Sequence, residues 1–201
     1  MKKNILIGIG VVIFLVAAFF ISNLANKEEK TELLSGKYYV EMSVKDFGKI
    51  SLELDADIAP ITVTNFMKLV NEKHYDGTKF HRIMKGFMVQ GGRNSSNPAS
   101  TIKGEFAANG IDNNLSHERG VISMARNNYN MDSASDQFFI MHEDNASLDG
   151  NYAAFGYVTE GMDVVDKLAE VEVVDDNGTV PEDKQPVIEY IKEVKNENYN
   201  K

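Results

Sequence analysis

The sequence predicts a mostly β domain with two helices, preceded by an apolar N-terminal segment. Residues 38–54 alternate between apolar and polar side chains, which is the period of half-buried strands. Two short stretches carry apolar residues at helical spacing, over residues 60–70 and 161–169. Between them the chain consists of short apolar runs interrupted by Gly, Asn, Asp and Ser, a pattern typical of a closed or nearly closed antiparallel barrel with long surface loops.

The N-terminal segment begins with Lys2 and Lys3 and continues with residues 5–21, which include no charged or strongly polar side chain. A helix of this length covers about 26 Å, and with residues 22–25 it can cross a hydrocarbon core of about 30 Å. We therefore expect a cytoplasmic stub over residues 1–4 and a transmembrane anchor over residues 5–25. The two lysines stay in the cytoplasm by the positive-inside rule, which sends the rest of the chain outward.

A cleavable signal peptide shares the basic start and the apolar middle, so it remains an alternative for this segment. The apolar run is longer than a usual signal core and no A-x-A site follows it, which favours the anchor. We expect a single-pass protein of the cell membrane with its folded domain outside the cytoplasm, or a secreted protein if the segment is cleaved. The chain has no cysteine, which excludes attachment through a lipidated cysteine.

The folded domain is expected over residues 37–194, between a polar tether at 26–36 and a polar tail at 195–201. Residues 38–54 predict an antiparallel hairpin that turns at Asp46-Phe47-Gly48. Pro60 then suits the first turn of a helix, because its missing N–H would be unpaired there in any case. Residues 161–169 predict the second helix, and residues 186–194 a last short strand.

The chain is acidic, with a formal net charge of −9. Such a charge is repelled by nucleic acid and by anionic lipid head groups, so no nucleic-acid partner is expected.

One arginine and one glutamine lie among bulky apolar residues in the segment 80–92, beside a glycine pair. The guanidinium of Arg82 is always charged and presents a planar fork of donors, and the amide of Gln90 carries both a donor and an acceptor. This pattern predicts a water-poor pocket with one polar corner.

The segment 80–92 resembles the signature of the cyclophilins, the peptidyl-prolyl cis-trans isomerases. Further stretches match in the same order: Gly104-Glu105-Phe106 and residues 120–126, 135–140 and 148–156. The resemblance covers residues 37–194 and is to a bacterial membrane-anchored or exported form. It implies a closed eight-stranded antiparallel barrel capped by two α-helices.

The resemblance also implies that the domain accelerates rotation about X-Pro bonds of exported or unfolded proteins. Rotation breaks amide resonance against a barrier of about 20 kcal/mol, but it requires no proton transfer, covalent step or cofactor. A donor aimed at the proline nitrogen stabilises the twisted amide more than the planar ground state. Arg82 matches the arginine that supplies this donor, and Gln90 matches the glutamine that braces it and contacts the substrate backbone.

The remaining expected site residues match positions that bind the substrate. Ala125 and Arg126 match a stretch whose backbone binds the residue before the proline, and Gln137 matches a polar contact along the groove. The residues that match the proline-ring pocket and its edge are Phe87, Met88, Phe139, Leu148 and Tyr152.

Three positions depart from the best-known eukaryotic cyclophilins. Arg126 replaces a small polar residue, Tyr152 stands in place of a histidine, and Ser147 stands where many of them carry a tryptophan. Because a large aromatic surface and an indole N–H are then lost, binding of the inhibitor cyclosporin should be weak. The loop 127–132 also looks longer than in those relatives.

Two other functions remain open from the residues. The groove could hold proline-containing segments as a non-catalytic chaperone or scaffold module. A metal-dependent hydrolase would need His74, His117 and His142 with Glu143 or Asp144, but these lack H-E-x-x-H or paired short spacing, so no metal site is expected.

Two further motifs favour structural roles. His81 should face away from the groove if Arg82 faces it, because successive strand residues point to opposite faces. Residues 175–178 read as a turn, because a calcium loop would need further ligands. The expected partners are proline-containing polypeptides and, through the N-terminal helix, a membrane; a monomer is expected.

Overall fold

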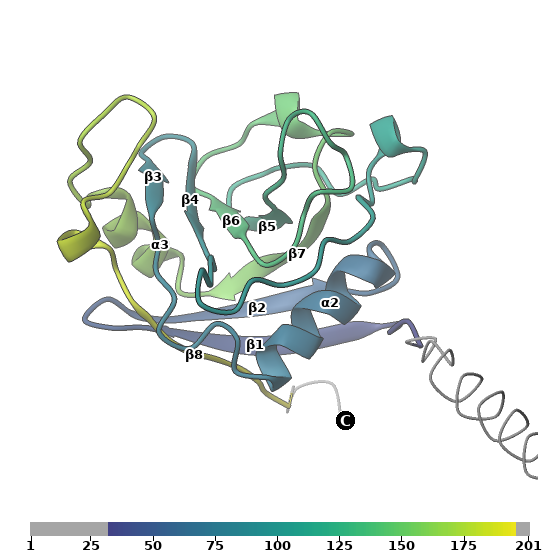
Figure 1. Cartoon of the computed structure of the whole chain (residues 1–201), viewed down its shortest axis with the longest axis horizontal. Helices are drawn as coiled ribbons and strands as arrows, with labels where there is room; N and C mark the ends of the chain where they lie inside the picture. The colour runs from purple at the N-terminus through teal and green to yellow at the C-terminus, as the bar shows by residue number, and fades with distance from the viewer. Residues whose placement is uncertain (1–31, 196–201) are drawn as a thin grey trace, which may run out of the picture. The chain divides into compact units, whose positions relative to one another are not determined.

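The computed structural model describes residues 32–195, which contain eight antiparallel strands and two α-helices (Figure 1). This confirms the mostly β class with two helices. In chain order the elements are β1 Lys37–Val44, β2 Gly48–Asp55, α2 Pro60–Asn71, β3 Arg82–Met84, β4 Met88–Gly91, β5 Val121–Met124, β6 Phe138–Met141, β7 Ala154–Glu160, α3 Met162–Ala169 and β8 Ile188–Glu193.

The predicted hairpin is formed by β1 and β2, which pair along their whole length from Lys37 opposite Asp55 to Val44 opposite Gly48. The turn between them places Asp46 at a φ of 65°, a left-handed conformation that aspartate tolerates better than most residues. The apolar residues from Val40 to Val44 and from Ile50 to Leu54 are buried, as the period of two requires, and Glu41, Ser51 and Glu53 between them are half-buried. Ser43 is buried as well, and its hydroxyl donates to Glu189 Oε2 at 2.7 Å.

The sheet does not close into the barrel that was expected. The strand ladders run in the order β3-β4-β6-β5-β7-β2-β1-β8, and within residues 32–195 no ladder joins β3 to β8. The two ends of the sheet are joined by isolated contacts: a bridge between Lys79 and Val187, and hydrogen bonds such as those from Phe80 N–H to the Pro186 carbonyl at 2.9 Å and from Ile188 N–H to the Thr78 carbonyl at 2.8 Å. The other edge of β3 is met by the loop that precedes β8, through a bridge between Arg82 and Thr179 and a hydrogen bond from Ile83 N–H to the Gly178 carbonyl at 2.8 Å, so the sheet is a half-barrel.

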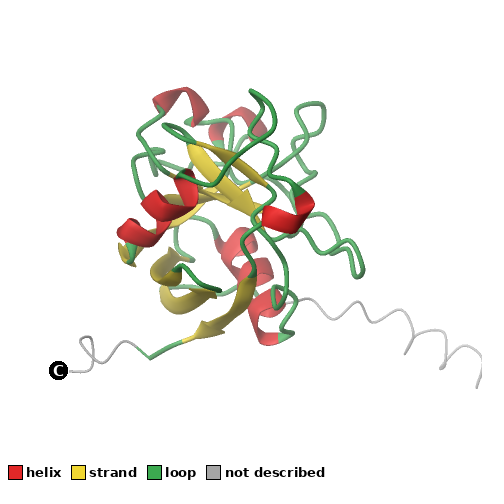
Figure 2. Ribbon diagram, turned by 90° about the vertical axis from the view of Figure 1, so that its left-hand side faces the viewer, coloured by secondary structure: helices red, strands yellow, loops and turns green. Residues whose placement is uncertain are grey.

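The core is organised around α2, which lies against the β1, β2 and β8 part of the sheet (Figure 1). The ring of Phe66 on this helix is fully buried. Its centroid lies 5.1 Å from that of Tyr75, 5.9 Å from Phe138 and 5.2 Å from Phe155, in tilted and edge-on arrangements. Such aromatic contacts add to the stabilisation from burial itself. Figure 2 distinguishes the helices, in red, from the strands, in yellow.

The strands β4, β5 and β6 are buried on both faces. On one face Val89, Ile122 and Ile140 join the main core. On the other face Met88 and Phe139 belong to a second apolar cluster, with other members from β5, β6 and β7. This second cluster is the floor on which the candidate site is built.

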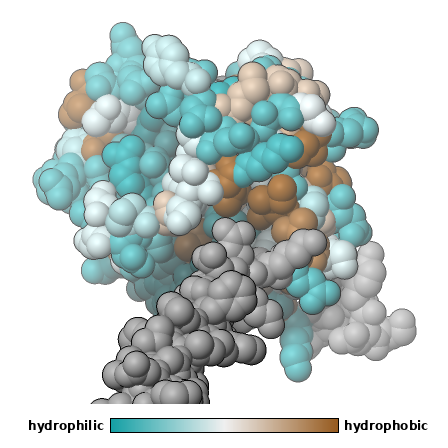
Figure 3. Space-filling model, turned by 45° about the vertical axis from the view of Figure 1, so that its right-hand side comes forward, coloured by the Kyte–Doolittle hydropathy of each residue, from teal (hydrophilic) through white to brown (hydrophobic). Residues whose placement is uncertain are grey.

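The expected cytoplasmic stub and membrane segment, residues 1–25, lie wholly outside the described residues, as do residues 196–201 of the predicted tail. Within residues 32–195 there is no helix with the length and apolar character needed to span a bilayer. The end of the predicted tether contacts the domain: Leu34 packs against the core, its N–H donates to Thr64 Oγ1 at 2.9 Å, and Gly36 N–H donates to Asp57 Oδ1 at 2.8 Å. The face shown in Figure 3 is largely hydrophilic, in keeping with the acidic composition.

Candidate active site

Arg82 and Gln90 occupy one row of residues that crosses four strands. Arg82 on β3 lies opposite Gln90 on β4, which lies opposite Phe139 on β6, which lies opposite Ser123 on β5. Residues directly opposite each other in antiparallel strands project from the same face of the sheet. The fold therefore places the predicted polar pair on the face that carries the second apolar cluster.

Three contacts hold the guanidinium of Arg82. Its Nε donates to the Asn177 carbonyl at 2.8 Å, Nη1 donates to Gln90 Oε1 at 3.3 Å, and Nη2 lies 3.0 Å from Met84 Sδ. A guanidinium has five N–H groups, so one on Nη1 and one on Nη2 have no partner within residues 32–195. Partial removal of the guanidinium from water lowers the pKa of Arg82 from its ordinary value.

A chain of side-chain amides continues from Arg82. Gln90 accepts from Arg82 at Oε1 and donates from Nε2 to Gln137 Oε1 at 3.2 Å. The same oxygen of Gln137 accepts from Arg93 Nη2 at 3.3 Å. The network fixes the orientation of the Gln90 amide and connects two arginines on either side of it.

Arg82 and Gln90 line a cavity of about 390 Å³. Of the expected site residues, Gln137 alone is absent from its lining. The lining residues are Arg82, Phe87, Met88, Gln90, Ala125, Arg126, Asn128, Phe139, Leu148, Tyr152 and Asn177. Asn128 and Asn177 were not expected from the sequence. Both lie in surface loops, and Asn177 is in the turn at residues 175–178, where the sequence offers no signal beyond turn formation.

The apolar wall of the cavity is supported from behind by His117. Its ring stacks on Phe139 at a centroid distance of 6.0 Å, and Phe139 meets Tyr152 edge-on at 5.8 Å. His117 Nδ1 lies 2.8 Å from Asp149 Oδ1 and Nε2 lies 3.1 Å from Ser123 Oγ. Burial lowers the pKa of His117, although hydrogen bonding to Asp149 opposes the effect. The side chain of His117 is 1% exposed, so it is not accessible to a substrate. Its role is to position Phe139 through the stacking contact.

Arg126 lies at the edge of the cavity. Nε donates to the Asn151 carbonyl at 2.8 Å and Nη1 to the Asn127 carbonyl at 3.0 Å. The guanidinium carbon lies 5.1 Å from the ring centroid of Phe106 and 4.8 Å from that of Tyr152, within the range of cation–π attraction. These contacts hold a positive charge at the rim.

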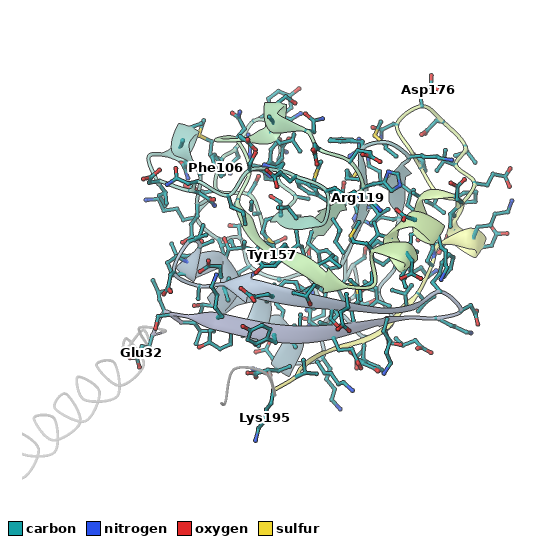
Figure 4. All side chains as sticks on the ribbon, turned by 180° about the vertical axis from the view of Figure 1, so that it is seen from behind. Glu32, Phe106, Arg119, Tyr157, Asp176 and Lys195 are labelled. Atoms are coloured by element: carbon teal, nitrogen blue, oxygen red, sulfur yellow. The ribbon has the colours of Figure 1, made fainter. Side chains whose placement is uncertain are left out.

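The two loops that line the cavity come from different sides of the domain. In Figure 4, Asp176 marks the tip of the loop that carries Asn177. Phe106, whose ring contacts Arg126, is labelled at the upper left of the same view, across from Asp176. The loop at 127–132 contributes Asn128, whose Oδ1 accepts from the Tyr152 hydroxyl at 3.2 Å.

Ser147 does not line the cavity, although its neighbour Leu148 does. It is exposed in the short 3₁₀ turn Ala146–Leu148, where its hydroxyl donates to Asn145 Oδ1 at 2.6 Å. The position is therefore open to solvent at the rim of the cavity.

The histidines lie apart from one another. His81 is absent from the lining of the Arg82 pocket and lines a different cavity with Thr78 and Lys79. His74 is buried 3.1 Å from Asp136 Oδ2, and His142 Nδ1 accepts from Gly86 N–H at 3.1 Å. In the part of the chain that the structure describes, no group of three or more His, Asp or Glu side chains could hold a metal ion.

Comparison with known proteins agrees with this geometry. Residues 39–193 match the family model described as "Cyclophilin type peptidyl-prolyl cis-trans isomerase/CLD". The chain is 47% identical over 130 residues to peptidyl-prolyl cis-trans isomerase A of Dickeya dadantii (strain 3937), which covers 62% of this chain and 68% of the relative. It is 39% identical over 135 residues to peptidyl-prolyl cis-trans isomerase B of Bacillus subtilis (strain 168), which covers 65% and 90%.

A solved structure shows the same arrangement of the fold. It is a cyclophilin-type peptidyl-prolyl cis-trans isomerase of Cryptosporidium parvum, crystallised in the presence of the dipeptide Ala-Pro, with 25% identity and a TM-score of 0.68 over 79% of this chain and 99% of that one. The fold and the site define a proline-specific isomerase. The chain belongs to the cyclophilin-type peptidyl-prolyl cis-trans isomerases.

Proposed function

We propose that the chain isomerises X-Pro bonds of unfolded or exported polypeptides by stabilising the twisted amide, with no covalent step. The observation that supports this mechanism is the state of Arg82: three contacts fix the guanidinium, and two N–H groups remain available beside an apolar wall. A fixed donor stabilises charge that develops only in the transition state, because no reorganisation is then needed.

The apolar residues around Arg82 have a matching role in this proposal. The proline ring lies against Phe139, Met88 and Leu148, and its presence excludes water from the guanidinium. A cation in such surroundings donates a stronger hydrogen bond than it would in bulk water. Gln90 orients Arg82 and offers its amide to the substrate backbone, and Ala125 and Arg126 contact the residue before the proline.

The test is exchange spectroscopy by nuclear magnetic resonance on a peptide with one X-Pro bond. With a small molar fraction of the protein, exchange peaks between the cis and trans forms should appear, because uncatalysed isomerisation takes tens of seconds. Binding of the peptide without accelerated exchange would contradict the isomerase and favour the non-catalytic scaffold module.

We propose weak binding of cyclosporin, for which the exposed Ser147 beside Leu148 is the reason. Ser147→Trp adds an aromatic surface and an indole N–H at the rim and should tighten cyclosporin binding about tenfold, which corresponds to about 1.4 kcal/mol. Isothermal titration calorimetry measures the change, with Ser147→Ala as the matched control. Equal cyclosporin affinities of the unmodified protein, Ser147→Trp and Ser147→Ala would show that the side chain at position 147 does not limit binding.

We also propose that the domain lies outside the cytoplasmic membrane. The uncharged run 5–21 after two lysines supports an anchor with this orientation. The intact mass of the protein from the membrane fraction tests the anchor, since a mass that lacks the first segment would mean cleavage and release.

A further inference from the structure

A second cavity, of about 320 Å³, adjoins the pocket of Arg82 and shares Gln90, Ala125 and Arg126 with it. Its other lining residues are Arg93, Asn127, Ser133, Ser135 and Gln137. Two of the lining side chains are cationic and none is a carboxylate. The composition of this second cavity suits an anionic group better than an apolar one.

The arginines of the groove differ from the remaining arginine of the described chain. Residues 32–195 include four arginines. Arg119 forms an ion pair with Asp166 at 2.6 Å and lines neither of the two groove cavities. Arg82, Arg93 and Arg126 form no ion pair with a carboxylate of the described residues, although the protein is acidic. Their positive charge is therefore available to a ligand.

Arg93 and Arg126 present this charge in complementary ways. Arg126 is held in place by two backbone carbonyls and two aromatic rings, with Nη2 unpartnered within the described residues. Arg93 is exposed and makes one side-chain contact, from Nη2 to Gln137 Oε1 at 3.3 Å, which leaves Nε and Nη1 free in the same part of the chain. A carboxylate in the second cavity can accept from both guanidinium groups.

We propose that Arg93, together with Arg126, selects substrates with an aspartate or glutamate in the segment that precedes the isomerised proline. The inference rests on the proposed function, in which Ala125 and Arg126 contact the residue before the proline. Because the second cavity begins at these two residues, it receives a side chain further toward the N-terminus of the substrate. Arg93 is then a specificity-determining residue that the sequence did not indicate.

The first test compares three peptides that differ in one residue, with Glu-Ala-Pro, Gln-Ala-Pro or Lys-Ala-Pro at their centre. By exchange spectroscopy at low salt, the full-length protein should have a kcat/KM about fivefold higher for the Glu peptide than for the Gln peptide, equivalent to about 1 kcal/mol. The Lys peptide should be the poorest substrate. The preference should shrink in 1 M NaCl, where charges are screened beyond about 3 Å.

The second test measures kcat/KM for the three peptides in two variants of Arg93 and in one control variant. Arg93→Gln should abolish most of the preference, and Arg93→Glu should reverse it in favour of the Lys peptide. Lys45→Gln is the matched control, because Lys45 is exposed in the β1–β2 turn and lines neither cavity. It should leave the ratio unchanged.

Two results would overturn the proposal: equal turnover of the three peptides by the unmodified protein, or the same loss of preference in Arg93→Gln and Lys45→Gln. The second result would assign the preference to net charge. The failure of the proposed function is distinguishable, because the unmodified protein would then turn over none of the three peptides.

Discussion

Arg82→Ala should lower kcat/KM for X-Pro isomerisation by about 10²- to 10³-fold, a loss of about 2.7–4 kcal/mol of transition-state stabilisation. The change removes the N–H groups that are left on Nη1 and Nη2 and leaves the apolar wall of Phe139 intact. Substrate binding should therefore weaken less than the rate. Exchange spectroscopy measures kcat/KM, and a peptide titration of chemical shifts measures binding.

Two further variants separate the geometry of the donor from its charge. Arg82→Lys keeps the positive charge but loses the planar fork and the contact from Nε to the Asn177 carbonyl, so we expect an intermediate activity. Lys85→Ala removes a neighbouring cation that is exposed and paired with Glu170 at 2.6 Å, and it should leave kcat/KM unchanged. Activity of Arg82→Ala at the level of the unmodified protein would refute the mechanism.

Glu105→Ala should lower the free energy of unfolding by about 3 kcal/mol, because it leaves two N–H groups without acceptors and removes a buried charge-assisted contact. Glu105 is 1% exposed. Its Oε1 accepts from Ile61 N–H at 2.9 Å and its Oε2 from Thr62 N–H at 2.7 Å, both in the first turn of α2. The helix has no side-chain cap of its own and no acidic residue in that turn, so Glu105 satisfies its N-terminus and complements its dipole.

Urea unfolding followed by circular dichroism measures the loss. Glu105→Gln keeps one acceptor oxygen but loses the charge, so its free energy of unfolding should lie between those of the unmodified protein and Glu105→Ala. Glu118→Ala removes an exposed glutamate that forms no ion pair within the described residues, and it should change stability by less than about 0.5 kcal/mol. An unfolding free energy of Glu105→Ala within that same margin would show that the N-terminus of α2 does not depend on this carboxylate.

Much of the fold was predictable because its signals are local. The alternation over residues 38–54 and the proline at position 60 describe neighbours in the chain, and the hairpin and α2 form where these signals lie. The closed barrel was wrong because closure depends on how far β3 pairs, and a three-residue strand gives no periodic pattern from which to judge.

The candidate site was only partly predictable. The family motifs indicated the residues that the fold brings to the cavity, with Gln137 in the adjoining one. The apolar strands alone could not show which residues face it: Phe138 enters the main core and its neighbour Phe139 forms the wall, because β6 is buried on both faces. Glu105 appeared in the sequence as one part of a matching motif, without any sign that it caps a helix.

The sequence by itself determined the class of fold, the acidic charge, and the chemical types present in the motif around Arg82. These properties depend on residues that are close together in the chain. Only the tertiary structure decided which groups hold that arginine, because Asn177, whose carbonyl accepts from its Nε, is 95 residues away. The same applies to Arg93, whose place beside the groove follows from its contact with Gln137, 44 residues further along. Contacts of this kind are set by strand register and loop geometry, which no local pattern of side chains encodes.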